Sequence, residues 1–253
     1  MATSQTLNNV RPKSATLPIG MIAAFPREIR PLLKGRSKVC SINRASRENP
    51  RRKIYSLELA NRAVILTVAG AGAENSYQSA RGLMTEFALG GLISVGFAGA
   101  LSPALRAGDV VLASEVLDQI TGERFYSAPG LLPIRCSTSG KLLSASAVIS
   151  SCEEKLRLGK QWEALAVDME SAGVARAAAQ AGLPFAAVKS ITDSAERSLS
   201  IDFNRCRRED KDFSLWAIAR QSLATSKGVR DLWMLARNSR QAAATLAAAL
   251  AFV

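Results

Sequence analysis

The fold of this chain is decided by the stretch Ile19-Gly20-Met21-Ile22-Ala23-Ala24-Phe25-Pro26-Arg27-Glu28. It begins with an apolar run that is as long as a typical buried strand. Pro26 then suits the first turn of a helix, where the backbone N–H that proline lacks would have no partner. A strand that passes directly into a helix is the repeating unit of α/β proteins, and Glu28 falls at the start of that helix.

The rest of the chain repeats this alternation. Strands are predicted at Ile19–Ala24, Ile54–Leu59, Ala63–Val68, Gly91–Val95, Asp109–Ala113, Leu165–Val167 and Phe185–Ser190. Helices are predicted at Pro26–Lys34, Asn75–Phe87 and Glu170–Ala181, with two more after Asn204. The pattern favours an α/β fold in which a mixed β-sheet is flanked by helices. We expect a flexible tail over residues 1–16 and one domain over residues 17–253.

Two segments fall outside the alternation. Ile120–Ser139 contains two prolines and predicts a long surface connection. Phe213–Val253 carries two amphipathic helical patterns, with Trp216 and Trp233 among the apolar positions. We expect these helices to pack on the sheet, with a membrane-surface or partner-binding role as the alternative.

The net charge of +12 is concentrated near the beginning of the chain, since residues 1–62 hold 13 Lys or Arg against 3 Asp or Glu. Such an excess suggests an acidic partner. Nucleic-acid-binding surfaces, however, interleave basic side chains with exposed aromatic ones. Aromatic residues make up only 6% of the chain, and Tyr55 alone lies close to Arg51-Arg52-Lys53. We therefore expect a solvated basic surface and no nucleic-acid partner.

The composition also bears on metals and on location. Cys40, Cys136, Cys152 and Cys206 are widely separated and the chain has no histidine, so no zinc site is expected. Reduced thiols favour a cytoplasmic protein. The apolar run from Leu17 is short and lacks a cleavage site, so we expect neither a signal peptide nor membrane insertion.

Small-residue turns are predicted after three strands: Ala23-Ala24-Phe25, Gly70-Ala71-Gly72-Ala73 and Gly96-Phe97-Ala98-Gly99-Ala100. Glycine at a strand end lets the backbone approach a ligand closely. The Gly70 stretch lacks the third glycine and the acidic partner of a dinucleotide fingerprint, and it lacks the Gly-Lys-Ser/Thr of a P-loop. These turns predict a ligand site without a cofactor.

Acidic residues are few, and several of them stand where strands pass into helices or turns. Glu28 follows the first strand, Asp168 and Glu170 flank Met169, and Asp193 follows a late strand. Each has a structural alternative as a helix cap or as a partner of a helix dipole. Because such junctions converge on one cleft of an α/β sheet, their grouping favours a functional site.

At these residues the sequence resembles the nucleoside phosphorylase superfamily, and within it the 5'-methylthioadenosine/S-adenosylhomocysteine nucleosidase branch. The segments that carry the resemblance are Ile19 to Glu28, Val95 to Ala100 with Gly108-Asp109-Val110-Val111, Ala166-Val167-Asp168-Met169-Glu170-Ser171, and Lys189-Ser190-Ile191-Thr192-Asp193. The resemblance implies a mixed sheet, a homodimer or higher oligomer, a purine nucleoside substrate and a place in methionine salvage.

The resemblance also implies roles for individual residues. Glu28 stands where the nucleosidases keep a water-activating carboxylate, and Asp193 where they keep the acid that protonates the leaving purine. Further residues expected to bind the substrate are Met169 and Glu170 at the ribose, Val148 and Ile149 at the base by a looser alignment, and Phe97, Gly72 and Lys189.

The chemistry supports these assignments. Cleavage of the C1'–N9 bond builds negative charge on the purine and positive charge on the ribose, so it needs an acid at the base and a carboxylate near the sugar. A carboxylate at Glu28 would repel phosphate and deprotonate water, which favours hydrolysis over phosphorolysis. Arg27 instead favours phosphorolysis, because its side chain could bind a phosphate.

Departures from the family pattern leave the substrate open. Lys189 stands where Arg is common, Asp168 where Glu is common, and Phe97 where Ser is common. The segment from Val167 to Ser171 also resembles hopanoid-associated nucleosidases, which implies an adenosylated lipid as an alternative substrate. The same residues are compatible with a phosphate-dependent purine nucleoside phosphorylase and with a non-catalytic nucleoside-binding protein.

Overall fold

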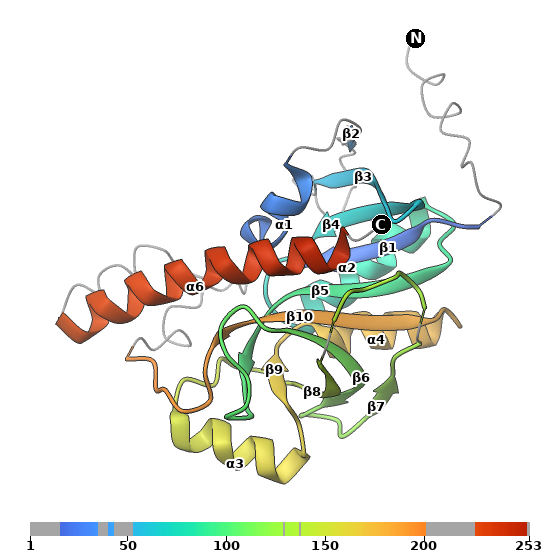
Figure 1. The fold of residues 1–253 in the computed structure, drawn as a ribbon. Helices are drawn as coiled ribbons and strands as arrows, with labels where there is room; N and C mark the ends of the chain where they lie inside the picture. Colours follow the sequence, from blue (N-terminus) through green and yellow to red (C-terminus); the bar gives the residue numbers. More distant parts are fainter. Residues whose placement is uncertain are drawn as a thin grey trace.

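The computed structural model describes residues 16–34, 40–42, 53–128, 130–136, 138–200 and 226–251 (Figure 1). Its strands are β1 (Ile19–Ala23), β2 (Cys40–Ile42), β3 (Ile54–Leu59), β4 (Arg62–Val68), β5 (Gly91–Ala100), β6 (Val110–Asp118), β7 (Arg124–Tyr126), β8 (Thr138–Ser144), β9 (Ala166–Asp168) and β10 (Phe185–Asp193). The helices described are α1 (Pro26–Leu33), α2 (Ala73–Glu86), α3 (Cys152–Trp162), α4 (Ser171–Gln180) and α6 (Ser226–Leu250). The predicted α/β fold with a mixed sheet is confirmed.

Strand β5 organises the sheet because it changes its neighbour along its length. Its first half pairs in parallel with β1, up to Ala23 opposite Val95. Its last residues pair with antiparallel β9, where Gly99 lies opposite Val167. Strand β10 runs parallel along the other edge of β5. Between the end of β1 and the start of the β9 pairing, one edge of β5 is open, and the candidate site lies at this opening.

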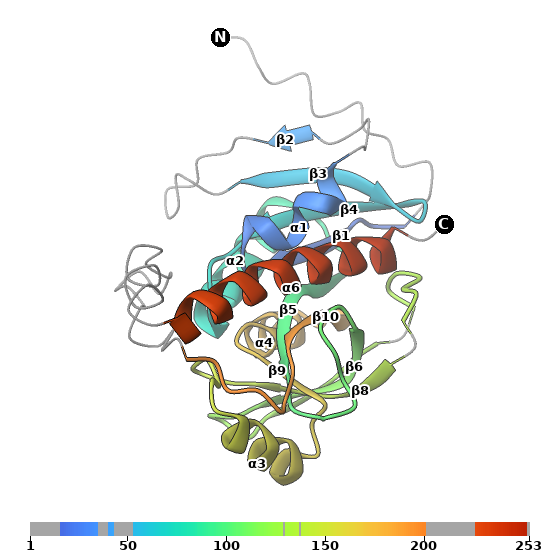
Figure 2. The same ribbon diagram turned by 60° about the vertical axis from the view of Figure 1, so that its left-hand side comes forward.

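The sheet consists of a closed part and an open extension. Strands β5, β10, β6, β8 and β9 pair in turn and return to β5, whereas β1, β4, β3 and β2 continue outward from it (Figure 2). Strands β1, β4, β5 and β10 are parallel, so their carboxyl ends lie at the same edge. This edge is where α/β sheets bind ligands.

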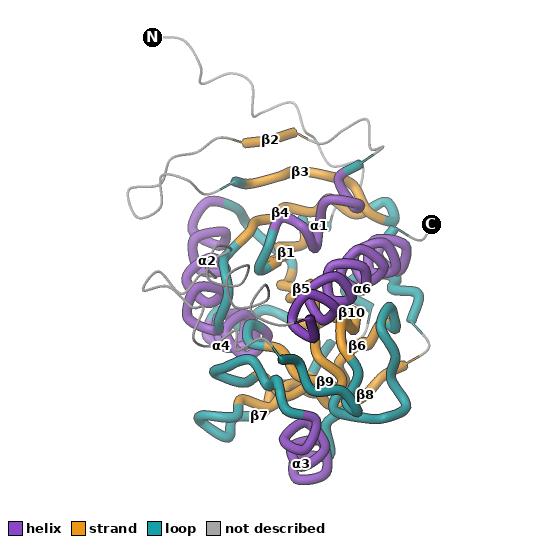
Figure 3. The backbone as a smooth tube through the Cα atoms, turned by 90° about the vertical axis from the view of Figure 1, so that its left-hand side faces the viewer, coloured by secondary structure: helices purple, strands orange, loops and turns teal. Residues whose placement is uncertain are grey.

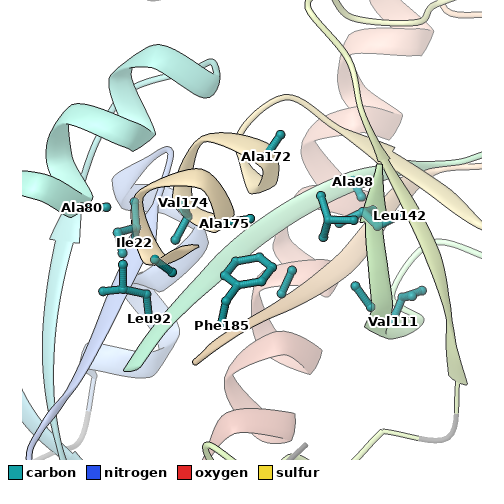
Figure 4. Packing of buried hydrophobic residues seen from close by; sticks show 14 of the residues in the cluster. Ile22, Ala80, Leu92, Ala98, Val111, Leu142, Ala172, Val174, Ala175 and Phe185 are labelled. Atoms are coloured by element: carbon teal, nitrogen blue, oxygen red, sulfur yellow. The ribbon is translucent and has the colours of Figure 1, made fainter. Parts of the chain in front are cut away.

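Helices cover both faces of the sheet. Helices α1 and α6 pack together on one face, and α2 and α4 pack together on the other (Figure 3). Met21 of β1 lies in the core with α1 and α6, while Ile22 lies in the core with α2 and α4. Figure 4 shows this second core, with Ile22, Leu92 and Phe185 beside Val174. Burial on both faces explains why the strand sequences are continuous apolar runs.

Helix α4 is made mainly of small residues, and at Gly173 its backbone touches the start of α2. A Cβ atom added to Gly173 would lie only 1.9 Å from the carbonyl oxygen of Ala73, so the backbones leave no room for a side chain there. This contact brings the N-terminus of α4, at Glu170, beside the N-terminus of α2, at Gly72.

Some expectations were wrong. The predicted connection Ile120–Ser139 contains β7 and the first residues of β8, whose start is too polar to read as a strand. The predicted turn at Gly96–Ala100 lies within β5, because the strand continues along β10 through Gly96, whose φ is +150°. Strand β2, the rest of β8 and helix α3 were also not expected.

The C-terminal region is described only in part. One of the two helices predicted after Asn204 is α6, whereas residues 201–225 and the tail up to residue 15 lie outside the described residues. Helix α6 packs through small and apolar residues such as Leu246, and Trp233 is 65% exposed instead of packed on the sheet. Within the described ranges, no helix combines the length and the apolar character needed to cross a membrane.

Candidate active site

Glu28 fills the opening beside β5. It stands in the first turn of α1 and is 3% exposed. Its Oε2 accepts hydrogen bonds from the backbone N–H groups of Ala24 at 2.8 Å and Phe25 at 2.9 Å. Its Oε1 accepts one from the backbone N–H of Phe97 at 3.1 Å. The Phe97 N–H is available because β1 has ended and β9 has not yet begun to pair at this point of β5.

Gly96 makes room for this carboxylate. A Cβ atom added there would lie 2.9 Å from both carboxylate oxygens of Glu28, closer than such atoms normally approach. Its φ of +150° is also a conformation that residues with side chains rarely adopt. The glycine therefore permits both the bend of β5 and the position of Glu28.

The surroundings of Glu28 suit a base. Burial raises the pKa of Glu28, and the Lys189 ammonium, the backbone N–H groups of Phe25 and Phe97, and Arg27 oppose that rise only in part. A carboxylate with a raised pKa accepts a proton more readily than one in water. The guanidinium of Arg27 lies outside, 4.9 Å from the ring centroid of Phe25 and 6.0 Å from that of Phe97.

Glu170 is a second buried carboxylate, and it connects β9 and α4 with α2. Its Oε1 accepts a hydrogen bond from the backbone N–H of Gly72 at 3.0 Å, and its Oε2 accepts one from Met169 at 3.2 Å. Met169 and Glu170 are each 8% exposed. Burial and then the nearby Asp168 carboxylate raise the pKa of Glu170 to about 7, while Lys189 and the Gly72 N–H act in the opposite direction.

Lys189 supplies positive charge to this group of carboxylates. It is 1% exposed, its Nζ lies 2.8 Å from Asp168 Oδ2, and it donates to Ser94 Oγ at 3.0 Å. Burial alone would lower the pKa of Lys189, but the carboxylates of Asp168, Glu170 and Glu28 outweigh it, so that the pKa is raised. These contacts are with protein groups, and contact of Lys189 with a substrate stays a prediction.

Asp168 also caps α4. Its Oδ2 accepts hydrogen bonds from the backbone N–H of Ser171 at 3.1 Å and from the Ser171 hydroxyl at 2.5 Å. The structural role considered for this residue is therefore present in the fold. Its other oxygen, Oδ1, is buried without a hydrogen-bond partner in the described part of the chain.

Asp193 is the last residue of β10 and lies beside Gly99 of β5. Its Oδ2 accepts a hydrogen bond from Lys155 Nζ at 2.5 Å, and its Oδ1 accepts one from Thr192 Oγ1 at 2.8 Å. A Cβ atom added to Gly99 would lie 3.2 Å from Asp193 Oδ2. The Asp193 side chain is 12% exposed, so it retains access to a ligand.

The structure thus brings most of the predicted site residues to one strand. Glu28 lies against Gly96 of β5 and Asp193 against Gly99, three positions further along. Glu170 joins the same group through its electrostatic interaction with Glu28. An acid and a base on either side of a ligand are the arrangement that glycosidic bond cleavage requires.

Val148 and Ile149 lie in the loop between β8 and α3 and are partly exposed. This loop is connected to the segment after Asp193, because the backbone N–H of Leu199 donates to the carbonyl oxygen of Ser150 at 2.9 Å. A contact of Val148 or Ile149 with the base stays a prediction.

Sequence reasoning missed Lys155, the buried partner of Asp193. The signal that could have placed it is the Ser-x-x-Glu capping pattern at Ser151 and Glu154, which marks the start of α3. The Ser151 side chain accepts a hydrogen bond from the Glu154 N–H. No group of three or more His, Cys, Asp or Glu that could hold a metal ion occurs among the residues described.

Comparison with known proteins identifies the family of the chain. The family model of the phosphorylase superfamily matches residues 18–138 and 127–224. A 5'-methylthioadenosine/S-adenosylhomocysteine nucleosidase of Staphylococcus aureus (strain bovine RF122 / ET3-1) is 26% identical over 210 residues, which are 73% of this chain and 90% of the relative.

Solved structures share the fold. The 5'-methylthioadenosine/S-adenosylhomocysteine nucleosidase of Helicobacter pylori matches with a TM-score of 0.65 at 18% identity, over 92% of this chain and 97% of its own. The futalosine hydrolase of Helicobacter pylori matches with a TM-score of 0.65 at 18% identity, over 91% of this chain and 96% of its own. The expected relationship is confirmed, and the chain belongs to the phosphorylase superfamily.

Proposed function

We propose that this chain is a nucleosidase that hydrolyses the N-glycosidic bond of a 5'-substituted adenosine and releases adenine. Glu28 activates the water, Asp193 protonates the leaving purine, and Glu170 accepts hydrogen bonds from the ribose hydroxyls above Met169. The observation that carries the proposal is the buried Glu28 carboxylate, held by the backbone N–H groups of Ala24 and Phe25 after β1 and of Phe97 on β5, the strand that also contacts Asp193.

In the proposed reaction the C1'–N9 bond breaks and its electron pair moves onto the purine, which takes the proton of Asp193. The water oxygen bonds to C1', and its proton passes to Glu28. The ionised carboxylates of Glu28 and Glu170 stabilise the positive charge that develops on the ribose ring. Glu28 then returns its proton to solvent, and Asp193 takes one up.

Water is favoured over phosphate because Glu28 occupies the anion-binding groups of the opening. The N–H groups of Ala24, Phe25 and Phe97 would otherwise be donors for a phosphate, but all three are bonded to the carboxylate. An ionised carboxylate has about four acceptor positions. Three are used, and the remaining one, on Oε1, is left to hold a water molecule.

The proteins that match in sequence and structure support a nucleosidase, and their substrates differ. Relatives are named for 5'-methylthioadenosine and S-adenosylhomocysteine, and one is named a futalosine hydrolase. The proposed substrate class, an adenosine with a 5' substituent, rests on the curated sequence relatives.

Purine release by the purified full chain tests the proposal. The substrates are 5'-methylthioadenosine, S-adenosylhomocysteine, futalosine, adenosine and inosine, each with and without phosphate. Free sugar and adenine formed without phosphate from the first two substrates support the proposal. Sugar 1-phosphate formed only with phosphate would make the chain a phosphorylase, and no release from any nucleoside would refute the proposed activity.

We further propose that the enzyme is a cytoplasmic homodimer. Cys136 and Cys152 are free thiols, which suits a reducing compartment. Light scattering on the purified protein tests the dimer, and fractionation of cells tests the location. A monomeric mass or a secreted pool would contradict the respective statement.

A further inference from the structure

Lys155 is a buried cation that has no part in the proposed reaction. It lies in α3, and none of its side chain is exposed. Its Nζ donates to Asp193 Oδ2 at 2.5 Å and to the backbone carbonyl oxygens of Ser194 at 3.1 Å and Arg197 at 3.2 Å. All three ammonium hydrogens therefore have an acceptor, and only one acceptor is charged.

Stability alone does not account for this lysine. A buried ion pair is often replaceable by apolar side chains without loss of stability, because removing both charges from water is costly. The neighbouring cation is paired elsewhere, since Arg197 binds Asp231 of α6 at 2.8 Å. Among the described residues, Asp193 is thus the carboxylate bound to Lys155, and Asp193 is the proposed proton donor.

Lys155 also lies where the loop expected to contact the purine meets the segment after β10. The backbone N–H of Cys152, at the start of α3, donates to Ser198 Oγ at 2.9 Å. The backbone N–H of Leu199 donates to the carbonyl oxygen of Ser150 at 2.9 Å. These bonds and the three bonds of Lys155 fix Asp193 relative to the loop before α3.

We propose that Lys155 is a positioning residue for protonation of the leaving purine, an inference that rests on the proposed function. Lys155 holds Asp193 Oδ2 and so orients the carboxyl group toward the base. When the C1'–N9 electron pair moves onto the purine, the proton of Asp193 passes to a purine nitrogen. The carboxylate that forms is stabilised by the Lys155 ammonium, which keeps its own protons throughout.

Two substrates with different leaving groups separate this role from a structural one. Adenine release from 5'-methylthioadenosine needs a proton on the leaving group. Release of 4-nitrophenolate from 4-nitrophenyl 5-methylthio-β-D-ribofuranoside does not, because nitrophenolate leaves as an anion. General acid catalysis contributes about 10²–10⁴-fold. For Lys155→Met we expect kcat for 5'-methylthioadenosine to fall about 100-fold and kcat for the nitrophenyl substrate to change by less than about threefold.

One matched control changes another lysine on the same helix, and a second one places a different cation at position 155. Lys160 is exposed on α3, so Lys160→Met should leave both rates unchanged. Lys155→Arg keeps the charge and should recover most of the 5'-methylthioadenosine activity. The double variant Lys155→Met/Asp193→Asn should be no slower than Asp193→Asn alone, because the two residues act in one step. Rates are compared at the pH optimum of each variant.

Equal losses on both substrates, or no loss on either, would overturn the role of Lys155. Failure of the proposed function is distinguishable, because the wild-type protein would then release no adenine from 5'-methylthioadenosine in the absence of phosphate. If Lys155→Met does not fold, Lys155→Gln replaces it, and the same ratio of the two rates decides.

Discussion

Gly96→Ala tests whether the position of Glu28, and not merely its presence, is needed for the reaction. The added Cβ would lie 2.9 Å from both carboxylate oxygens, whereas ordinary contacts begin at 3.4 Å. The Glu28 carboxylate therefore has to move by about 0.5 Å, the difference of these two distances. Its three backbone hydrogen bonds, which are 2.8–3.1 Å long, limit that movement.

We expect kcat to fall by about 10- to 100-fold, since a misplacement of about 1 Å in a catalytic site can cost 10²-fold. The unfavourable φ should also lower the free energy of unfolding by about 1–3 kcal/mol. Gly122→Ala is the matched control, because Gly122 has a φ of +73° and nothing within 4 Å of an added Cβ. It shares the cost of a positive φ but does not displace Glu28.

The assay combines kcat for adenine release with thermal unfolding of both variants. The expected result is a loss of stability in both and a loss of kcat in Gly96→Ala alone. A Gly96→Ala enzyme with wild-type kcat, or an equal loss of kcat in Gly122→Ala, would show that the closeness of Gly96 to Glu28 does not matter for turnover.

The remaining predictions concern the other buried charges. Asp193→Asn should lower kcat by at least about 10²-fold, because it removes the proposed proton donor and the counter-charge of the buried Lys155, and should leave the Kd of a nucleoside inhibitor within a few-fold, because inhibitor binding needs no proton transfer; a wild-type rate would exclude Asp193 as the acid. The pKa of Glu170 is raised to about 7, and in the proposed function the ribose hydroxyls bind its ionised form. KM should therefore rise roughly tenfold from about pH 8 to about pH 6. If Glu170→Gln showed the same pH dependence of KM, that dependence would belong to another group. Lys189→Met should lower the free energy of unfolding by about 3–5 kcal/mol in urea titrations, since it leaves Asp168 buried without its counter-charge; a change below about 1 kcal/mol would contradict this account.

The sequence predicts the central part of the fold and most of the proposed site because both depend on local signals. The apolar run before Pro26 specifies β1, α1 and the place of Glu28 in one stretch. The short strand before Met169 and Glu170 likewise marks their junction with α4. Strand ends of this kind can be located without knowledge of tertiary structure.

What the sequence does not predict depends on pairing between distant segments. Gly96 and Gly99 read as a turn, and only the register with β1, β9 and β10 makes them part of a strand. Lys155 is typical of a solvated helix face, and its burial follows from the course of residues 194–197 around it. A charged residue gives no local sign that the chain will enclose it.

The change of neighbouring strand along β5 also affects how enzymes with this fold can evolve a different nucleophile. The N–H of Phe97 is left unpaired by the order of the strands, so it is present whatever side chains surround it. If a small residue replaced Glu28, three convergent N–H groups, those of Ala24, Phe25 and Phe97, would become a ready receptor for an anion. Under the proposed mechanism, replacement of this one side chain would exchange a bound water for a bound anion at the opening, while the strand order and both cores stay intact.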